Sequence, residues 1–331
     1  MRYLSCYKVL AKDDQTNGGI GQGGGFYWTD TYGLALQKAI ADELGAEFIP
    51  HARLHGRDSF SGGDYDLPAE QVDIAYCQPF ECPTRRPADF VWTAISDYIG
   101  AYEHHLERFL EVVKPNLVVS LQYPLVPPLQ LPQLPQLGAL PNLVNQCALH
   151  GCKVVYLPWV NAVNIETYNA EKQYAGMCTG KMSGTYPFRD ASWKFLSRLA
   201  ETRDDIVVSG NPTGSTFSLS DEDYRRCLAS TKYYFTGGIY DLQIPPKVYE
   251  VMNYGACLVC PEMPMMEASG LIPYETYLPI ESIEEIPAIL ERDDWKEIAP
   301  KGQKLVHEKH SLVARARDIA EVYYEMTGKS Q

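Results

Sequence analysis

The sequence lacks the features that mark membrane, secreted and general nucleic-acid-binding proteins. It contains no run of about 18 apolar residues, the length that a membrane-spanning helix needs. Its 29 lysines and arginines are outnumbered by 42 aspartates and glutamates, and the net charge of −13 disfavours general binding to a phosphate backbone. The stretch from Met1 to Tyr7 is too short and polar for a signal peptide. We therefore expect a first strand there and a cytoplasmic protein.

The nine cysteines do not form a zinc-binding pattern. Cys257 and Cys260 lie in one apolar strand, where their side chains point to opposite faces, and no second Cys-x-x-Cys or histidine pair completes a metal site. We predict that the cysteines are reduced thiols in the core.

The composition is typical of a soluble globular protein, and the length indicates two domains. The chain has 331 residues, of which 45% are hydrophobic and 21% charged. This length suffices for two domains that each bury a core. Apolar strands alternate with helical patterns along both halves, which predicts an α/β protein. We find no internal sequence repeat.

The stretch 245–262 is the most informative part of the sequence. Pro245 and Pro246 suit a loop that leads into the first turn of a helix, which we expect to begin near Lys247. Gly255 ends that helix, and the apolar run 256–260 follows as a buried parallel strand. Glu250 is the one acid on this short helix. It is either a solvated side chain or a ligand-binding group beside a sheet.

The first half begins with a glycine-rich loop. Residues 17–25 include six glycines, and Asp30 is placed to cap a helix that runs from Leu34 to a stop at Gly45. Such a loop brings backbone amides close to a ligand at a helix N-terminus. Gly23, Gly24 and Gly25 are therefore candidates for a ligand-facing loop, although a loop without a ligand is also consistent with the pattern.

Further elements follow in the first half. We expect strands at 47–50, 72–77, 116–121 and 153–157, a polar excursion at 51–67, and helices at 91–113 and 143–149. The strand at 116–121 delivers Gln122 and Tyr123 to its carboxyl end, which makes both candidates for a cleft. The segment 124–141 contains six prolines and is not expected to be a regular helix.

The second half repeats the rhythm of strand, loop and helix. Lys181 and Arg189 flank a predicted helix start, as the binding of a diphosphate would require, although surface charges would give the same pattern. Gly237 and Gly238 end the strand 232–235 on the side where we expect Glu250.

The segment from Pro245 to Glu250 resembles the Pro-x-Arg-x-Phe-Glu element of the spore-protein branch of group 1 glycosyltransferases. Lys247 replaces the arginine and Tyr249 the phenylalanine, and Leu242 stands where wider members have a second glutamate. The resemblance covers about residues 174–325 and includes the Tyr-Pro-x-Arg element that ends at Arg189.

The resemblance implies the GT-B fold, in which two Rossmann-like domains face each other across a cleft. Residues 1–168 would form the acceptor domain and residues 169–311 the donor domain, with the terminal helix 312–331 packing back on the first. In the family, the residue matching Glu250 holds the ribose hydroxyls of the donor, and the residue matching Lys247 lies near the diphosphate.

The predicted function is transfer of a hexosyl or pentosyl group from a nucleoside diphosphate sugar, with UDP as the expected nucleotide, to a hydroxyl acceptor. Asp30 is the candidate base if the reaction inverts the sugar. No obligatory metal or other cofactor is expected, since cations and helix N-termini stabilise the leaving diphosphate in this fold. The candidate donor-binding residues are Glu250, Lys247, Tyr249, Arg189, Lys181, Gly237 and Gly238. The candidate acceptor-side residues are Gly23, Gly24, Gly25, Gln122 and Tyr123.

Two alternatives stay open. The missing glutamate at Leu242 is consistent with a catalytically silent protein that binds a sugar or nucleotide. Arg53, Arg57, Arg85 and Arg86 give some support to a phage-type enzyme that glycosylates hydroxymethylated pyrimidines in DNA. A Rossmann dehydrogenase or epimerase fits least well, because no Gly-x-Gly-x-x-Gly with a distal acid opens the chain in register. If the acceptor is not DNA, it is a glycan or a small molecule. The sequence does not specify the donor, retention or inversion at the transferred sugar, or the oligomeric state.

Overall fold

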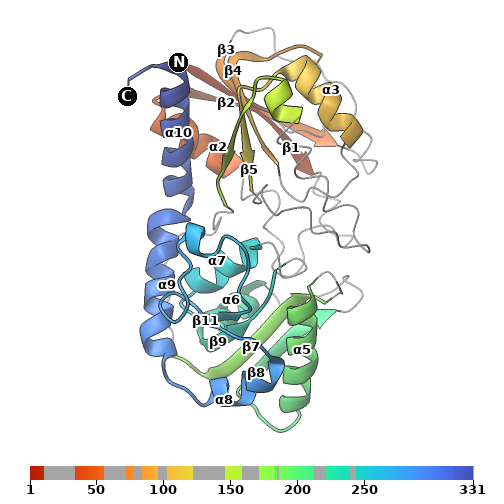
Figure 1. Cartoon of the computed structure of the whole chain (residues 1–331), viewed down its shortest axis with the longest axis vertical. Helices are drawn as coiled ribbons and strands as arrows, with labels where there is room; N and C mark the ends of the chain where they lie inside the picture. Colours follow the sequence, from red (N-terminus) through yellow and green to blue (C-terminus); the bar gives the residue numbers. More distant parts are fainter. Residues whose placement is uncertain are drawn as a thin grey trace. The chain divides into compact units, whose positions relative to one another are not determined.

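The computed structural model describes residues 1–10, 34–55, 72–77, 84–95, 103–121, 146–158, 171–182, 184, 186–211, 219, 221–238 and 244–330. These residues form two compact units (Figure 1). Unit 1 contains the described residues up to Pro158 and those from Arg315 onward, and unit 2 contains those from 171 to Ala314. The predicted boundary between residues 168 and 169 lies outside the described residues.

The described part of unit 1 contains a parallel sheet of six strands in the order β2-β1-β3-β4-β5-β6. The strands are β1 (Arg2–Leu10), β2 (Glu47–His55), β3 (Val72–Cys77), β4 (Ala88–Ile95), β5 (Leu117–Ser120) and β6 (Lys153–Tyr156). Its helices include α2 (Leu34–Glu43), α3 (Glu103–Val113) and most of α10 (Leu312–Thr327). The strand order reverses direction between β1 and β3, as in doubly wound α/β folds.

Successive side chains along the strands of this sheet point to opposite faces and are buried on both. Leu4 and Val91 belong to the core cluster that contains Phe109 of α3. Tyr3 and Trp92 are the sequence neighbours of Leu4 and Val91, so they point to the opposite face of the sheet. There, the Trp92 indole donates a hydrogen bond of 2.8 Å to the Tyr3 hydroxyl. The last turns of α10 also pack on unit 1, where the Tyr323 ring meets Phe90 edge-on at 4.9 Å and Glu325 pairs with Lys153 at 2.9 Å.

The predicted helix 91–113 is wrong in its first part. Residues 88–95 form strand β4, which pairs with β3 and β5, and α3 begins only at Glu103. Val91 and Ile95 match a helical spacing, but the run from Phe90 to Ile95 is rich in aromatic and β-branched residues, which favour a strand between two neighbours. Strand β2 also continues to His55, beyond the predicted end at residue 50.

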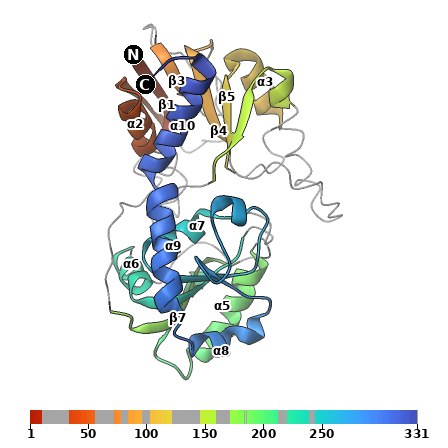
Figure 2. The same cartoon turned by 60° about the vertical axis from the view of Figure 1, so that its left-hand side comes forward.

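The described part of unit 2 contains a parallel sheet of five strands in the order β11-β10-β9-β7-β8. The strands are β7 (Tyr174–Lys181), β8 (Ile206–Asn211), β9 (Thr231–Phe235), β10 (Cys257–Cys260) and β11 (Leu278–Pro279). The helices are α5 (Pro187–Leu199), α6 (Asp221–Ala229), α7 (Pro246–Asn253), α8 (Ile286–Leu290) and α9 (Trp295–Lys309), with short 3-10 turns at Glu267–Ser269 and Ile283–Glu285. Within unit 2, α5 and α8 lie on one face of the sheet, and α6 and α7 lie on the other (Figure 2).

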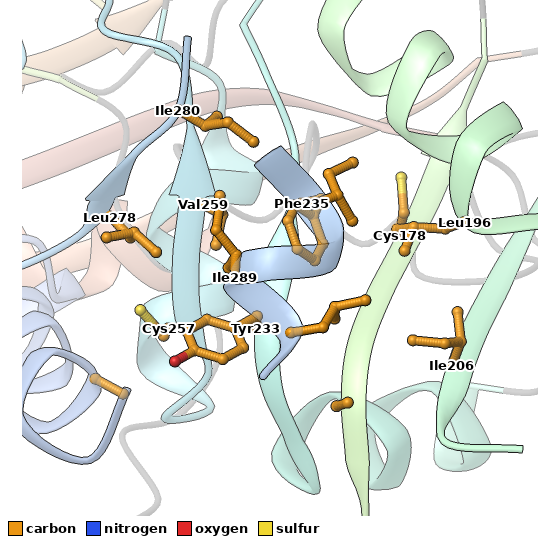
Figure 3. Packing of buried hydrophobic residues seen from close by; sticks show 14 of the residues in the cluster. Cys178, Leu196, Ile206, Tyr233, Phe235, Cys257, Val259, Leu278, Ile280 and Ile289 are labelled. Atoms are coloured by element: carbon orange, nitrogen blue, oxygen red, sulfur yellow. The ribbon is translucent and has the colours of Figure 1, made fainter. Parts of the chain in front are cut away.

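The core of unit 2 is continuous from the strands to α5 and α8. Figure 3 shows Phe235 and Val259 of neighbouring strands under Ile289 of α8, with Leu196 of α5 beside Cys178. Seven of the cysteines in the described residues are free and buried, which confirms the prediction of core thiols for those seven. Among the helices of the described part of the chain, none is long and apolar enough to cross a membrane.

Candidate functional site

The carboxyl edge of the sheet in unit 2 contains a point where the chain changes direction. Strand β7 is followed in sequence by β8 on one side, and the chain then returns to place β9 on the other side. Open α/β sheets bind ligands outside the carboxyl ends of the strands at such a point. Helices α5 and α7 begin at this edge, and each has a proline in its first turn, Pro187 in α5 and Pro246 in α7. Proline suits this position because the first amides of a helix have no partner within it.

Arg189 links the start of α5 to the end of β9. It lies in the first turn of α5 and is only 5% exposed. Its Nε donates a hydrogen bond of 3.0 Å to the Thr236 hydroxyl, and its Nη2 donates one of 3.4 Å to the carbonyl of Gly237. Its guanidinium also lies 4.0 Å from the centre of the Tyr186 ring. The interpretation of Arg189 as a surface charge is therefore wrong.

The end of β7 leaves room for this guanidinium through a glycine. Gly180 has a φ of +117°, and a Cβ placed on it would lie 3.4 Å from the Arg189 Nη1. A larger residue would strain the backbone and crowd the cation.

Lys247 and Glu250 form a buried ion pair on α7. The Lys247 Nζ lies 2.6 Å from the Glu250 Oε2, and the two side chains are 15% and 2% exposed. The same Nζ donates a hydrogen bond of 2.7 Å to the hydroxyl of Tyr224, which comes from α6. The interpretation of Glu250 as a solvated side chain is wrong, because its carboxylate is inside the protein and opposite a cation.

The electrostatics of this cluster favour an anion. Burial lowers the pKa of Lys247, and Arg189 lowers it further, while the Glu250 carboxylate opposes both effects. Arg189 and Lys247 both lie in the first turn of a helix, where the dipole is positive and a cation is disfavoured. Asp190, which follows Arg189, pairs with the exposed Lys194 at 2.6 Å. Two buried cations at helix starts are an arrangement that suits a bound anion.

The neighbouring thiol and phenol are not suited to react. Burial raises the pKa of Cys178 to about 12, and burial also raises the pKa of Tyr234, so both groups stay protonated at neutral pH. The Tyr234 hydroxyl instead lies 2.7 Å from the Thr179 hydroxyl, which ties β9 to β7.

The structure brings together four of the residues that were selected from the sequence. Arg189, Gly237, Lys247 and Glu250 share the carboxyl edge, and Gly238 follows Gly237 there. Tyr249 is fully buried, with its ring stacked on His310 at 4.3 Å. Lys181 is the last residue of β7, and its side chain is outside the described part.

The acceptor-side candidates are not described by the structure. Asp30, Gly23, Gly24, Gly25, Gln122 and Tyr123 all fall outside the described residues, so each stays a prediction.

Two contributors to the cluster were missed by the sequence reasoning. Tyr224 reaches Lys247 across 23 positions of sequence, and no local pattern marks it. Thr236 directly precedes the two glycines at the end of β9, and its position at a strand end was the signal that could have identified it.

Arg86 does not support the DNA-binding alternative. Its guanidinium is committed to the fold of unit 1, where it donates to the carbonyls of Ala88, Asp89, Val113 and Lys114 and to the side chain of Asn116. An arginine held by these backbone acceptors caps the end of α3 and is not presented to a phosphate backbone. Arg57 lies outside the described residues.

Within the described part of the chain, no three histidine, cysteine, aspartate or glutamate side chains are grouped as a metal ion would need. The metal-independent reaction stays a prediction.

Residues 189–321 match a protein family described as glycosyl transferase-like. The matched segment includes Arg189, Lys247 and Glu250, so the cluster belongs to the part of the chain that resembles this family. A search among curated proteins gave no significant match.

Solved structures of glycosyltransferases share the fold of this chain at low sequence identity. A glycosyltransferase from Rickettsia africae has a TM-score of 0.55 at 11% identity, with 99% of this chain and 100% of that chain covered. The HepE protein of Anabaena, solved with UDP and glucose, has a TM-score of 0.53 at 9% identity over 98% and 100% of the two chains. Sucrose-phosphate synthase from Thermosynechococcus elongatus has a TM-score of 0.51 at 9% identity, with both chains fully covered.

These likenesses show the fold. The chain has the α/β architecture of GT-B proteins, with two Rossmann-like domains. Further matches include longer proteins, of which this chain spans 58% and 55%.

Proposed function

We propose that the protein is a glycosyltransferase that moves a sugar from a nucleoside diphosphate sugar to a hydroxyl group of an acceptor. The observation that carries the proposal is the buried cluster of Arg189, Lys247 and Glu250 at the carboxyl edge of unit 2. The family match over residues 189–321 and the GT-B fold support the same activity. UDP is the first nucleotide to test, because the HepE structure was solved with it.

The chemistry of transfer requires negative charge to be stabilised on the leaving diphosphate. Arg189 and Lys247 are cations in the first turns of α5 and α7, so charge that develops on the phosphate oxygens would meet side chains and helix dipoles of the correct sign. No metal is needed in this scheme. The Glu250 carboxylate accepts hydrogen bonds only, which suits the two donor hydroxyls of a ribose.

In the proposal, residues 169–311 form the donor domain and residues 1–168 the acceptor domain, with the terminal helix 312–331 packing on the latter. Asp30 would deprotonate the acceptor in an inverting reaction. A cytoplasmic location is part of the same proposal, as is membership of the spore-protein branch of group 1 glycosyltransferases. A glycan or small molecule is the acceptor that we favour.

Thermal unfolding with UDP, GDP, ADP and uridine tests the donor site. A ligand that binds only the folded state stabilises it by about 2.7 kcal/mol at 100 times its Kd. We expect UDP to raise the unfolding temperature, and Arg189→Gln to weaken UDP binding roughly 10- to 100-fold, since hydrogen bonds to charged groups contribute about 1.5–3 kcal/mol. Uridine has no phosphate, so its binding should be unchanged in this variant.

Matched variants separate the two ends of the nucleotide. Glu250→Gln should weaken UDP and uridine by the same factor, because both contain the ribose. The controls are Arg198→Gln on the same helix α5 and Glu267→Gln, both at exposed positions, and neither should change any affinity. Equal loss of uridine binding in Arg189→Gln would contradict the assigned phosphate contact.

Turnover decides between an enzyme and a silent binder. We expect release of UDP when the protein is incubated with a panel of UDP-sugars and hydroxyl acceptors. A protein that binds UDP tightly but releases none from any sugar nucleotide would contradict the proposed transfer and favour the silent binder.

A further inference from the structure

A pair of cysteines in unit 1 lies at the end of a helix. Residues 146–149 are helical and Gly151 has a φ of +74°, a left-handed conformation that suits glycine. The Cys152 amide donates to the Cys147 carbonyl at 2.9 Å, and the Gly151 amide donates to the Ala148 carbonyl at 3.0 Å. These two bonds define a Schellman motif, which brings the side chains of its first and last residues together.

In this chain, both of those residues are cysteines. Cys147 is fully buried and Cys152 is 7% exposed, and both belong to the core cluster under α3. Cys152 and burial raise the pKa of Cys147, whereas Cys147 lowers the pKa of Cys152. Arg86, whose donors hold the carbonyls at the end of α3, also lowers the pKa of Cys152.

We propose that Cys147 and Cys152 are a redox-modification site that forms a reversible disulfide when the protein meets a peroxide. The backbone hydrogen bond between the two residues keeps them next to each other at the helix end, and a disulfide needs two neighbouring cysteines. Cys152 is the more exposed sulfur and lies near a cation, so it is the thiol that reacts first.

The reaction is balanced with hydrogen peroxide as the oxidant. The Cys152 thiolate attacks one peroxide oxygen, the O–O bond breaks, and a sulfenic acid and hydroxide are produced. The Cys147 sulfur then attacks the Cys152 sulfur, the S–O bond breaks, and the proton of Cys147 leaves with the oxygen as water. Two thiols are oxidised by two electrons, and one peroxide is reduced to two waters.

The sequence contains a matched internal control. Cys257 and Cys260 are closer in sequence than Cys147 and Cys152 and are equally buried, but they lie three residues apart on strand β10 and point to opposite faces. Sequence proximity would favour a bond between Cys257 and Cys260, whereas the helix-end geometry favours Cys147 and Cys152.

Peptide mapping of the native full chain tests the proposal. The protein is treated with hydrogen peroxide, free thiols are then alkylated, and the digest is analysed without reduction. We expect the peptide that contains Cys147 and Cys152 to lose the mass of two hydrogens and to regain it with dithiothreitol, while Cys257 and Cys260 are alkylated. In Cys147→Ser, Cys152 should stop at a sulfenic acid that dimedone traps.

Two outcomes would overturn the proposal. One is alkylation of both Cys147 and Cys152 under conditions that oxidise other thiols of the folded chain. The other is dimedone labelling of Cys152 in the wild type to the same extent as in Cys147→Ser, which would show that Cys147 does not resolve it.

Discussion

Two lysines at opposite edges of the same sheet in unit 2 show how one residue type can be used for two purposes. Lys172 precedes β7 at the amino edge, and its Nζ donates hydrogen bonds of 2.7 Å each to the carbonyls of Ala229 and Gly255. These carbonyls lie at the ends of α6 and α7, where the helix dipole is negative and a cation is favoured. Lys247 lies at the start of α7, where the dipole has the opposite sign.

The difference separates a lysine that donates to helix-end carbonyls from one that lies at a helix start beside a carboxylate and a second cation. The Lys172 ammonium group donates hydrogen bonds to backbone carbonyls that are part of the fold itself. Lys247 is offset by Glu250, but Arg189 adds a second cation at the same edge. We infer that Lys172 serves stability and that Lys247 serves the binding of an anion, and three experiments test this contrast.

The largest expected effect is that of removing Lys247 alone. Lys247→Met leaves the Glu250 carboxylate buried without its cation, and such a change costs about 3–5 kcal/mol of unfolding free energy. Urea denaturation measures it. Replacing the whole pair in Lys247→Met/Glu250→Leu should recover most of the lost stability while UDP binding stays lost. The exposed Lys194→Met is the control, with a change of at most about 0.5 kcal/mol. A double variant no more stable than the single one would contradict the assigned ion pair.

A smaller effect is expected at the amino edge. Lys172→Met removes the charged donor of two helix-end carbonyls and should lower the unfolding free energy by about 2 kcal/mol, since hydrogen bonds to charged groups are stronger than neutral ones. The increase in unfolding temperature that UDP produces should be the same as in the wild type. Weaker UDP binding in Lys172→Met would contradict the inference that Lys172 serves stability alone.

The smallest effect is a pH dependence that Lys172 causes. Burial lowers the pKa of Lys172 to about 8, below its usual 10.5, so the unfolded chain binds more protons between these two values. Stability due to this group therefore rises as the pH increases from 8 towards 10.5, by no more than about 1.4 kcal/mol per pH unit. We expect the stability difference between wild type and Lys172→Met to be larger at pH 9.5 than at pH 7. A difference that shrinks with pH would show that the charged form is the one that the fold prefers.

Much of the fold of unit 2 was predictable because its signals are local. Pro246 begins α7, Gly255 has the positive φ that ends it, and the apolar run from Cys257 to Cys260 is a strand buried on both sides. Each of these features depends on residues within one turn or one strand. The error at Val91 arose because the same apolar spacing fits a helix, and only pairing with two neighbouring strands selects β4.

The candidate site was predictable as a set of residue types but not as a set of partners. Ligands of parallel sheets bind at the carboxyl ends of the strands, and this rule placed Glu250 and Gly237 on one edge. The resemblance to group 1 glycosyltransferases indicated Arg189. The contacts themselves were not visible in the sequence, since Arg189 meets Thr236 and Lys247 meets Tyr224 across two different crossovers.

The sequence by itself therefore determined the order and type of most described elements, the α/β class and the short list of charged residues worth testing. The tertiary structure decided which of those charges are buried and which cation faces a helix start or a helix end. The physical reason is the difference in the sequence separation over which these interactions act. Backbone conformation responds to neighbours within a few residues, whereas desolvation and charge pairing depend on groups that only the folded sheet brings together.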